Sequence, residues 1–109
     1  MAIKLIIYED NSRLRQSLKL LLGEGKGFDV VGAFPDCDAA EKQVHKLQPE
    51  LVIMDIDMPG IGGIKGIKII KSVFPEVKIV IHTVFDDDNR IFECICAGAD
   101  GYLLKNISP

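Results

Sequence analysis

The stretch LVIMDIDMPG, residues 51 to 60, begins as an uninterrupted apolar run and turns acidic at Asp55. Apolar runs without alternation are typical of parallel strands that are buried on both faces. We therefore expect a short strand at residues 51–54. Asp55 would stand at the carboxyl end of this strand, and ligands bind beyond such ends in open α/β sheets. The stretch predicts a buried strand with a candidate functional residue directly after it.

Apolar runs of the same kind recur on both sides of this stretch and alternate with helical patterns. Further strands are expected at residues 3–8, 28–34, 77–81 and 102–104. Helices are expected between the strands, at residues 12–24, from Asp36 or Asp38 to Pro49, at 64–73 and at 86–97. The apolar residues of the first three helices recur at spacings that place them on one face. They are Leu14, Leu18, Leu21 and Leu22, then Ala40, Val44 and Leu47, then Ile64, Ile67, Ile70 and Val73.

Residue types that favour helix ends support these boundaries. Asn11 or Ser12 can cap the first helix, and Asp36 or Asp38 the second. Their side-chain oxygens accept hydrogen bonds from the free N–H groups of a first helical turn. Gly98 can end the fourth helix, because glycine adopts the left-handed conformation common at helix C-termini.

The elements follow one another as a strand and a helix repeated, closing on a fifth strand. Short loops and right-handed crossovers favour a doubly wound sheet of the α/β class for such a chain. We expect a five-stranded parallel sheet with strand order 2-1-3-4-5, a flavodoxin-like arrangement, in one domain over residues 1–109.

Composition excludes several classes of function. Lys and Arg number 13 and Asp and Glu 16, for a net charge of −3, which argues against nucleic-acid binding by this segment. No apolar run approaches the roughly 20 residues that cross a bilayer, so no membrane contact is expected. The three cysteines, Cys37, Cys94 and Cys96, fit neither a disulfide framework nor a zinc site. We expect free thiols in a reducing cytoplasm.

Polar residues gather at the carboxyl ends of the predicted strands. Glu9 and Asp10 follow the first strand, Asp55 the third, Thr83 the fourth and Lys105 the fifth. Strands 1, 3, 4 and 5 would be consecutive neighbours about 4.8 Å apart, so these side chains would line one rim. Each residue alone could be a helix cap, a loop acid or a surface charge. Their convergence from separate segments favours a functional site.

The acidic residues of this rim indicate a metal and phosphoryl chemistry. Carboxylates at ~4 Å repel each other by on the order of 4 kcal/mol at an effective dielectric constant of about 20. Mg²⁺ suits such a site, because it binds through one or two carboxylates and takes phosphate oxygens. An aspartate can act as a nucleophile and form an aspartyl phosphate. A metal and Lys105 would neutralise the phosphoryl oxygens, and Thr83 would donate a hydrogen bond to one of them.

Four segments together resemble the receiver domain of two-component response regulators. They are Glu9-Asp10, MDIDMPG at residues 54–60, His82-Thr83 and GADGYLLK at residues 98–105. The resemblance covers essentially the whole chain, and the last segment is most similar to regulators with a helix-turn-helix DNA-binding domain. It implies a phosphorylation-dependent signalling switch. Catalysis would be limited to self-phosphorylation from a phosphodonor and slow autodephosphorylation.

The resemblance also implies roles for individual residues. Asp55 would accept a phosphoryl group from a sensor histidine kinase in a Mg²⁺-dependent reaction. The side chains of Glu9, Asp10 and Asp55 and the backbone carbonyl of Asp57 would bind Mg²⁺.

A switch and a set of partners complete what the resemblance implies. Thr83 would move toward the phosphoryl group, Tyr102 would turn inward behind it, and Lys105 would contact the phosphate. The face around the fourth helix and fifth strand would bind partners or a second protomer. DNA would be bound only through an output domain that this chain lacks, and the output would be transcriptional.

The chain departs from the family's pattern after its fourth and fifth strands. Val84 stands where a small residue is usual, and we hypothesise that it slows phosphate hydrolysis. Asn106 stands where many receivers have a proline, which puts the usual cis peptide in doubt. A receiver also needs a fifth helix, and only residues 106–109 follow Lys105. We therefore expect a receiver domain truncated before or at the start of its last helix.

Two other classes of function remain open from the sequence. Asp55-Ile56-Asp57 resembles the DxD motif of haloacid-dehalogenase-type phosphatases, which form an aspartyl phosphate. That motif normally follows the first strand, whereas this one follows the third, and Pro59 stands where such enzymes have Thr or Val. The second alternative is a receiver-like interaction module that is never phosphorylated. The acidic pair, Thr83 and Lys105 argue against it.

Overall fold

The computed structural model describes residues 2–24, 27–83 and 88–104, which form one parallel sheet and its helices. In chain order the elements are β1 (Ile3–Tyr8), α1 (Ser12–Glu24), β2 (Phe28–Phe34), α2 (Ala40–Leu47), β3 (Leu51–Asp55), α3 (Gly62–Val73), β4 (Lys78–Thr83), α4 (Asp88–Ala97) and β5 (Gly101–Leu104). The strands pair in parallel in the order β2-β1-β3-β4-β5. The predicted fold class and strand order are confirmed. No helix of the described ranges is long and apolar enough to cross a membrane.

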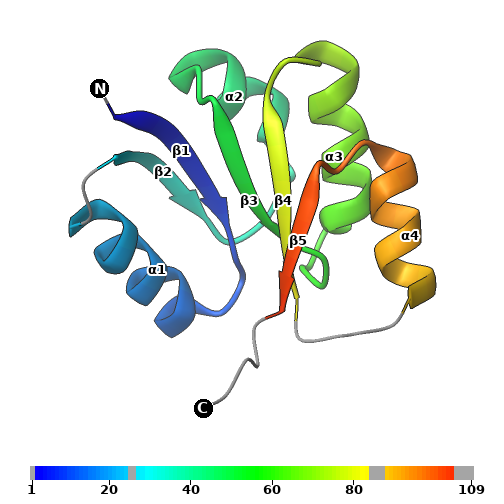
Figure 1. The fold of residues 1–109 in the computed structure, drawn as a ribbon, viewed down its shortest axis with the longest axis horizontal. Helices are drawn as coiled ribbons and strands as arrows, with labels where there is room; N and C mark the ends of the chain where they lie inside the picture. The colour runs from blue at the N-terminus through cyan, green and yellow to red at the C-terminus, as the bar shows by residue number, and fades with distance from the viewer. Residues whose placement is uncertain (1, 25–26, 84–87, 105–109) are drawn as a thin grey trace.

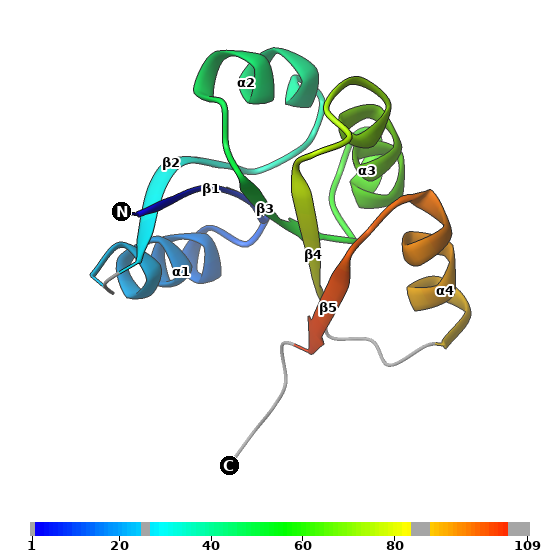
Figure 2. The same cartoon turned by 45° about the horizontal axis from the view of Figure 1, so that its top comes forward.

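The helices cover the two faces of the sheet unequally (Figure 1, Figure 2). Helix α1 lies on one face against β1 and β2, and α2, α3 and α4 lie on the opposite face, each beside the next. Strand β2 is added on one side of β1, and β3, β4 and β5 are added on the other side. The strand order therefore reverses between β1 and β3, and the carboxyl ends of these two strands flank the reversal. Ligands of doubly wound folds bind at such a reversal.

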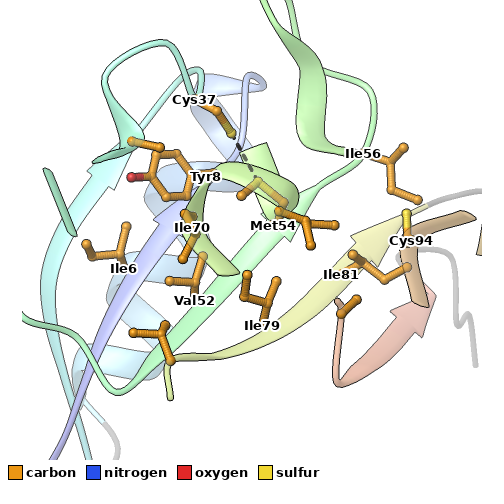
Figure 3. Close-up of a cluster of buried hydrophobic side chains, with 14 of the residues drawn as sticks. Ile6, Tyr8, Cys37, Val52, Met54, Ile56, Ile70, Ile79, Ile81 and Cys94 are labelled. Carbon is orange, nitrogen blue, oxygen red and sulfur yellow. Dashed lines mark hydrogen bonds between the residues drawn. The ribbon is translucent and has the colours of Figure 1, made fainter. Parts of the chain in front are cut away.

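The main core lies between the sheet and helices α2, α3 and α4. Figure 3 shows this core, and its side chains come from alternate strand positions and from the facing helices. Residues with no exposed surface there include Ile6, Val52, Met54, Ile70, Ile79 and Ile81. Burying side chains of this size contributes about 1.5–3 kcal/mol each, so this core supplies most of the stabilisation.

The other face of the sheet is covered over only part of its width. Leu5 and Ile7 of β1 are fully buried there, beside α1. Ile53 of β3 and Val80 of β4 are half-buried, and Leu103 of β5 is 54% exposed. The described residues include helices α1 to α4 and no fifth helix. Residues 105–109, on which the predicted truncation rests, lie outside them, so that truncation stays a prediction.

Some predicted boundaries and faces need correction. Helix α3 begins at Gly62 rather than Ile64, and β4 runs from Lys78 to Thr83 rather than over residues 77–81. Leu21 is 69% exposed and Val73 is 46% exposed, although both were predicted to lie on buried helical faces. At 3.6 residues per turn Leu21 falls at the edge of its apolar stripe, and Val73 is the last residue of α3.

The predicted cap of α2 is wrong. The N-cap residue is Ala39, which makes no side-chain capping bond. Asp36 Oδ1 instead accepts a hydrogen bond from the backbone N of Asp38 at 3.0 Å, and Asp38 Oδ1 accepts one from the backbone N of Ile61 at 3.1 Å. Asp38 therefore binds the backbone just before α3 and does not cap α2. Gly98 does end α4 as predicted, with a φ of 120°.

Candidate functional site

Strand register brings the predicted site residues to one edge of the sheet. Tyr8 of β1 pairs with Met54 of β3, so the next residues, Glu9 and Asp55, follow on adjacent strands. Asp55 in turn pairs with His82 of β4, one residue before Thr83. Carboxylates and a hydroxyl from three strands therefore meet at the same carboxyl edge.

The three predicted acidic residues form a tight cluster. One carboxylate oxygen from each of Glu9, Asp10 and Asp55 lies within 4.8 Å of the others. Glu9 is 1% exposed and Asp55 is 4% exposed, whereas Asp10 is exposed. Two nearly buried carboxylates beside a solvent-facing one form a site that is anchored in the protein and open to water on one side.

This donor set fits a hard divalent cation. Close carboxylates repel one another, and the repulsion grows as burial lowers the local dielectric constant. A cation among them offsets the repulsion and replaces lost hydration. Mg²⁺ binds in proteins through a few carboxylate oxygens and keeps several waters, which the exposed side at Asp10 leaves room for.

The turn between β1 and α1 holds Glu9 in place. Glu9 Oε2 accepts a hydrogen bond from the backbone N of Asn11 at 3.1 Å, and Arg15 Nη1 donates to the Glu9 carbonyl at 2.8 Å. Asn11 Oδ1 accepts from the backbone N of Leu14 at 3.0 Å, which confirms Asn11 as the cap of α1. The first turn of α1 thereby fixes the acidic pair against the sheet.

Contacts of Gly63 and Ile61 hold the loop between β3 and α3, which follows Asp55. The backbone N of Gly63 donates to the carbonyl of Ile56 at 3.0 Å. A Cβ on Gly63 would come within 2.3 Å of the Asp55 carbonyl oxygen, so only glycine allows α3 to approach the strand end this closely. Asp38, in the connection between β2 and α2, accepts a hydrogen bond from Ile61 of the same loop. The backbone around Asp55 is therefore fixed from two sides.

The side chain of Asp57 is paired with a residue that the sequence did not single out. Arg90 Nη2 of α4 lies 2.5 Å from Asp57 Oδ1, and the two side chains are 33% and 45% exposed. Both line a hollow of about 380 Å³ between the β3–α3 loop, the start of α3 and Arg90. This pair could not be predicted from the sequence, because Asp57 and Arg90 are 33 residues apart and no local pattern links them. The predicted metal contact of Asp57 concerns its backbone carbonyl and stays a prediction.

The remaining predicted site residues differ in how far the structure describes them. Thr83 is 1% exposed at the end of β4, the strand that pairs with β3 and its residue Asp55. Tyr102 pairs with Ile81 and is 49% exposed. Lys105, Val84 and Asn106 lie outside the described residues. The roles of Thr83, Tyr102 and Lys105 therefore stay predictions.

Two ionisable side chains close to the site are kept neutral. Burial, and to a smaller extent the carboxylates of Asp36, Asp38 and Asp55, together raise the pKa of the Cys37 thiol to about 12. Burial also raises the pKa of the Tyr8 hydroxyl, with Cys37 and Asp36 adding to the effect. The Tyr8 hydroxyl donates a hydrogen bond to Gln43 Oε1 at 2.8 Å. Neither group offers an anion to a metal, so the donors of this edge are carboxylates.

Comparison with known proteins places the chain in a family. Residues 5–109 match the family profile described as "Response regulator receiver domain". The transcriptional regulatory protein LnrK of Bacillus subtilis is 39% identical over 97% of this chain and 48% of its own length. The oxygen regulatory protein NreC of Staphylococcus epidermidis is 34% identical over 95% of this chain and 48% of its own length. The chain thus spans about half the length of these relatives.

A solved structure agrees in fold and in sequence. The DNA-binding response regulator of the LuxR family from Staphylococcus aureus has a TM-score of 0.89 and 29% identity. The match covers 97% of this chain and 88% of that one. The parallel order β2-β1-β3-β4-β5 and the acidic cluster at its carboxyl edge agree with these matches. The chain belongs to the response regulator receiver domain family.

Proposed function

We propose that this receiver domain accepts a phosphoryl group on Asp55 and transmits the change to an output domain. The observation that carries the proposal is the cluster of Glu9, Asp10 and Asp55, with carboxylate oxygens within 4.8 Å. Asp55 is the member at the end of the central strand β3, and it is 4% exposed. Receiver domains of the family generally bind Mg²⁺ at such residues, and this cluster would hold it here.

The proposed chemistry uses the clustered carboxylates together with Thr83 and Lys105. A carboxylate oxygen of Asp55 attacks the phosphorus of a phosphohistidine, forming an O–P bond while the P–N bond breaks. The released imidazole nitrogen takes up a proton from water. When bound, Mg²⁺ neutralises charge on the phosphoryl oxygens. Glu9 and Asp10 would hold the cation, and Thr83 and Lys105 would supply a hydrogen bond and a positive charge to the remaining oxygens.

The response to phosphorylation is proposed to pass through β4, α4 and β5. A phosphoryl group adds roughly −1.5 to −2 charges and three acceptor oxygens beside Thr83. Thr83 gains an acceptor there, and the half-exposed ring of Tyr102 turns inward behind it. The face of α4 and β5 would contact a partner or a second protomer, and the exposed apolar side chains of these two elements include Ile95 at 47% and Tyr102 at 49%.

The donor and the output are proposed from the relatives. We propose that the protein acts in the cytoplasm and that a sensor histidine kinase supplies the phosphoryl group there. LnrK is named a transcriptional regulatory protein, and this chain covers 48% of its length. We therefore propose a transcriptional output through a DNA-binding segment that lies outside the matched part, and no catalytic turnover of a separate substrate.

The proposal is tested by labelling the protein with a small phosphodonor. Acetyl phosphate and Mg²⁺ should add one phosphoryl group to the wild type, measured by intact mass, and none to Asp55→Asn. Asp29→Asn, which removes an exposed carboxylate from β2, is the matched control and should label like the wild type. Equal labelling of Asp55→Asn would overturn the assignment.

The same experiment separates the two alternative functions. Repeated turnover of a phosphomonoester by the wild type would indicate a phosphatase. Absence of Mg²⁺-dependent labelling in a protein with a normal circular dichroism spectrum would indicate an interaction module. Stoichiometric labelling that chelator prevents supports the receiver function.

A further inference from the structure

We propose that Arg90 sets which divalent cation the acidic site prefers, by holding the Asp57 carboxylate out of the cluster. This inference rests on the proposed metal site of Glu9, Asp10 and Asp55 and adds a specificity-determining residue to it. Arg90 does not contact the cluster's cation in this proposal. It acts through Asp57, so it is a positioning residue.

The first support is the separation of Asp57 from the cluster. Asp57 follows Asp55 by two residues, at the start of the loop that carries the site. Its carboxylate is nevertheless not one of the three whose oxygens lie within 4.8 Å of one another. Asp57 Oδ1 lies 2.5 Å from Arg90 Nη2 instead. A fourth carboxylate is thus present beside the site and is held by α4.

The second support is the surroundings of the pair. The residues that line the hollow next to it are Ile56, Asp57, Met58, Ile61, Gly62, Gly63, Ile64 and Arg90. Among these described residues Asp57 and Arg90 are the two that carry charge. Replacing Arg90 by a neutral residue would therefore leave no cation in this lining to hold the carboxylate. A cation bound by the cluster would then attract this carboxylate.

The chemistry of divalent cations links this movement to selectivity. Mg²⁺ demands near-octahedral geometry and binds through one or two carboxylates with several waters, whereas Ca²⁺ takes six to eight oxygens in flexible geometry. A fourth carboxylate would add oxygens that Ca²⁺ uses and Mg²⁺ does not need. With Asp57 held by Arg90, the site offers a small donor set that favours Mg²⁺ over Ca²⁺.

The test measures cation binding directly, without phosphorylation. The affinities of the full chain for Mg²⁺ and for Ca²⁺ are compared by isothermal titration calorimetry, for the wild type, Arg90→Gln and Arg90→Gln/Asp57→Asn. We expect Arg90→Gln to shift the ratio of affinities toward Ca²⁺ by roughly tenfold, which corresponds to about 1.4 kcal/mol. The double variant should return to the wild-type ratio, because the fourth carboxylate is gone.

Two controls separate this effect from a change in overall charge. Arg90→Lys keeps the positive charge beside Asp57 and should keep the wild-type ratio. Lys68→Gln removes one positive charge from α3 and should raise both affinities slightly and equally. If Arg90→Gln also raises both affinities by the same factor, or if the double variant keeps the shift, the role of Asp57 is refuted.

Failure of this inference differs from failure of the proposed function. A wild type that binds no Mg²⁺ contradicts the proposed site itself. A wild type that binds Mg²⁺, with Arg90→Gln of unchanged selectivity, contradicts the role of Arg90 alone. Circular dichroism would check that each variant is folded. Asp57→Asn by itself should leave the ratio unchanged, because the Asp57 carboxylate is not part of the cluster.

Discussion

Asp55 would accept a phosphoryl group, yet its side chain is only 4% exposed and lies among other carboxylates. In the absence of a cation, its charge repels those of Glu9 and Asp10. We expect Asp55→Asn to raise the free energy of unfolding by about 1–3 kcal/mol in low salt with chelator. Urea unfolding followed by circular dichroism measures this. Mg²⁺ should stabilise the wild type and leave Asp55→Asn almost unchanged, and a variant less stable than the wild type would argue against repulsion in the cluster.

The cysteines also differ at the scale of single residues. Cys37 and Cys94 are buried, and burial raises the pKa of both thiols, whereas Cys96 is exposed. At pH 8 we expect one thiol of the native protein to react rapidly with a disulfide reagent and all three to react in urea, because the thiolate is the reactive form. Cys96→Ser should lose the rapid reaction. Rapid reaction of two thiols in the folded protein would contradict the burial of Cys37 and Cys94.

At the scale of elements, the contact between α3 and the end of β3 depends on Gly63. A methyl group there would meet the Asp55 carbonyl at 2.3 Å. We expect Gly63→Ala to destabilise the protein by about 1–3 kcal/mol, because α3 must move away from the strand. Gly23→Ala in α1 is the control, since nothing lies within 4 Å of its Cβ. That control should gain roughly 0.5–1 kcal/mol from helix propensity. Thermal unfolding of both variants tests the contrast.

Asp100, in the connection between α4 and β5, contacts Lys71 and the backbone N of Ile79. These contacts are strongest when Asp100 is ionised, so protonation would weaken them. Partial burial of Asp100 disfavours its charge, but hydrogen bonds from Lys71 Nζ and the backbone N of Ile79, with the charges of Lys71 and Lys78, lower its pKa below the usual 3.8. A lowered folded-state pKa stabilises the protein above the unfolded pKa, and the gain disappears as the pH falls through the folded pKa.

We therefore expect Asp100→Asn to be less stable than the wild type at pH 6 by up to about 1 kcal/mol, because the ion pair is partly exposed. The difference should shrink as the pH falls below 3.8. Urea unfolding of both proteins from pH 6 to pH 3 measures it. A difference that does not depend on pH would show that the charge of Asp100 contributes nothing.

The strands and helices, and the site at the ends of the strands, could largely be predicted from the sequence. Apolar runs and helical periodicity are local, so strands, helices and the cap at Asn11 could be predicted. The acidic cluster could also be predicted, because parallel strands bring their carboxyl ends to one edge. The hydrogen bond from Ile61 to Asp38 and the pairing of Arg90 with Asp57 could not. They join residues far apart in the chain, and either acid has an equally good local explanation as a cap or a solvent-facing loop residue.

For the whole molecule, the unequal covering of the sheet predicts where substitutions are tolerated. Ile79 of β4 has no exposed surface, whereas Leu103 of the neighbouring β5 is 54% exposed. We expect Ile79→Ala to cost about 2–5 kcal/mol, through lost burial and a cavity. Leu103→Ala should cost less than about 1 kcal/mol. Denaturant titration of the two variants measures the difference, and a large loss from Leu103→Ala would mean that this face is covered in solution.

The strand order also has a consequence for how the protein is made. Among the strands of this sheet, β1 leaves the ribosome before the others, becomes an inner strand and pairs with both β2 and β3. Its ladder can close on both sides once residue 55 has emerged, so a three-stranded unit with α1 and α2 can form during synthesis. Strands β4 and β5 would then add to an existing edge one after the other. Synthesis at about 5–20 residues per second gives this unit several seconds before β5 follows.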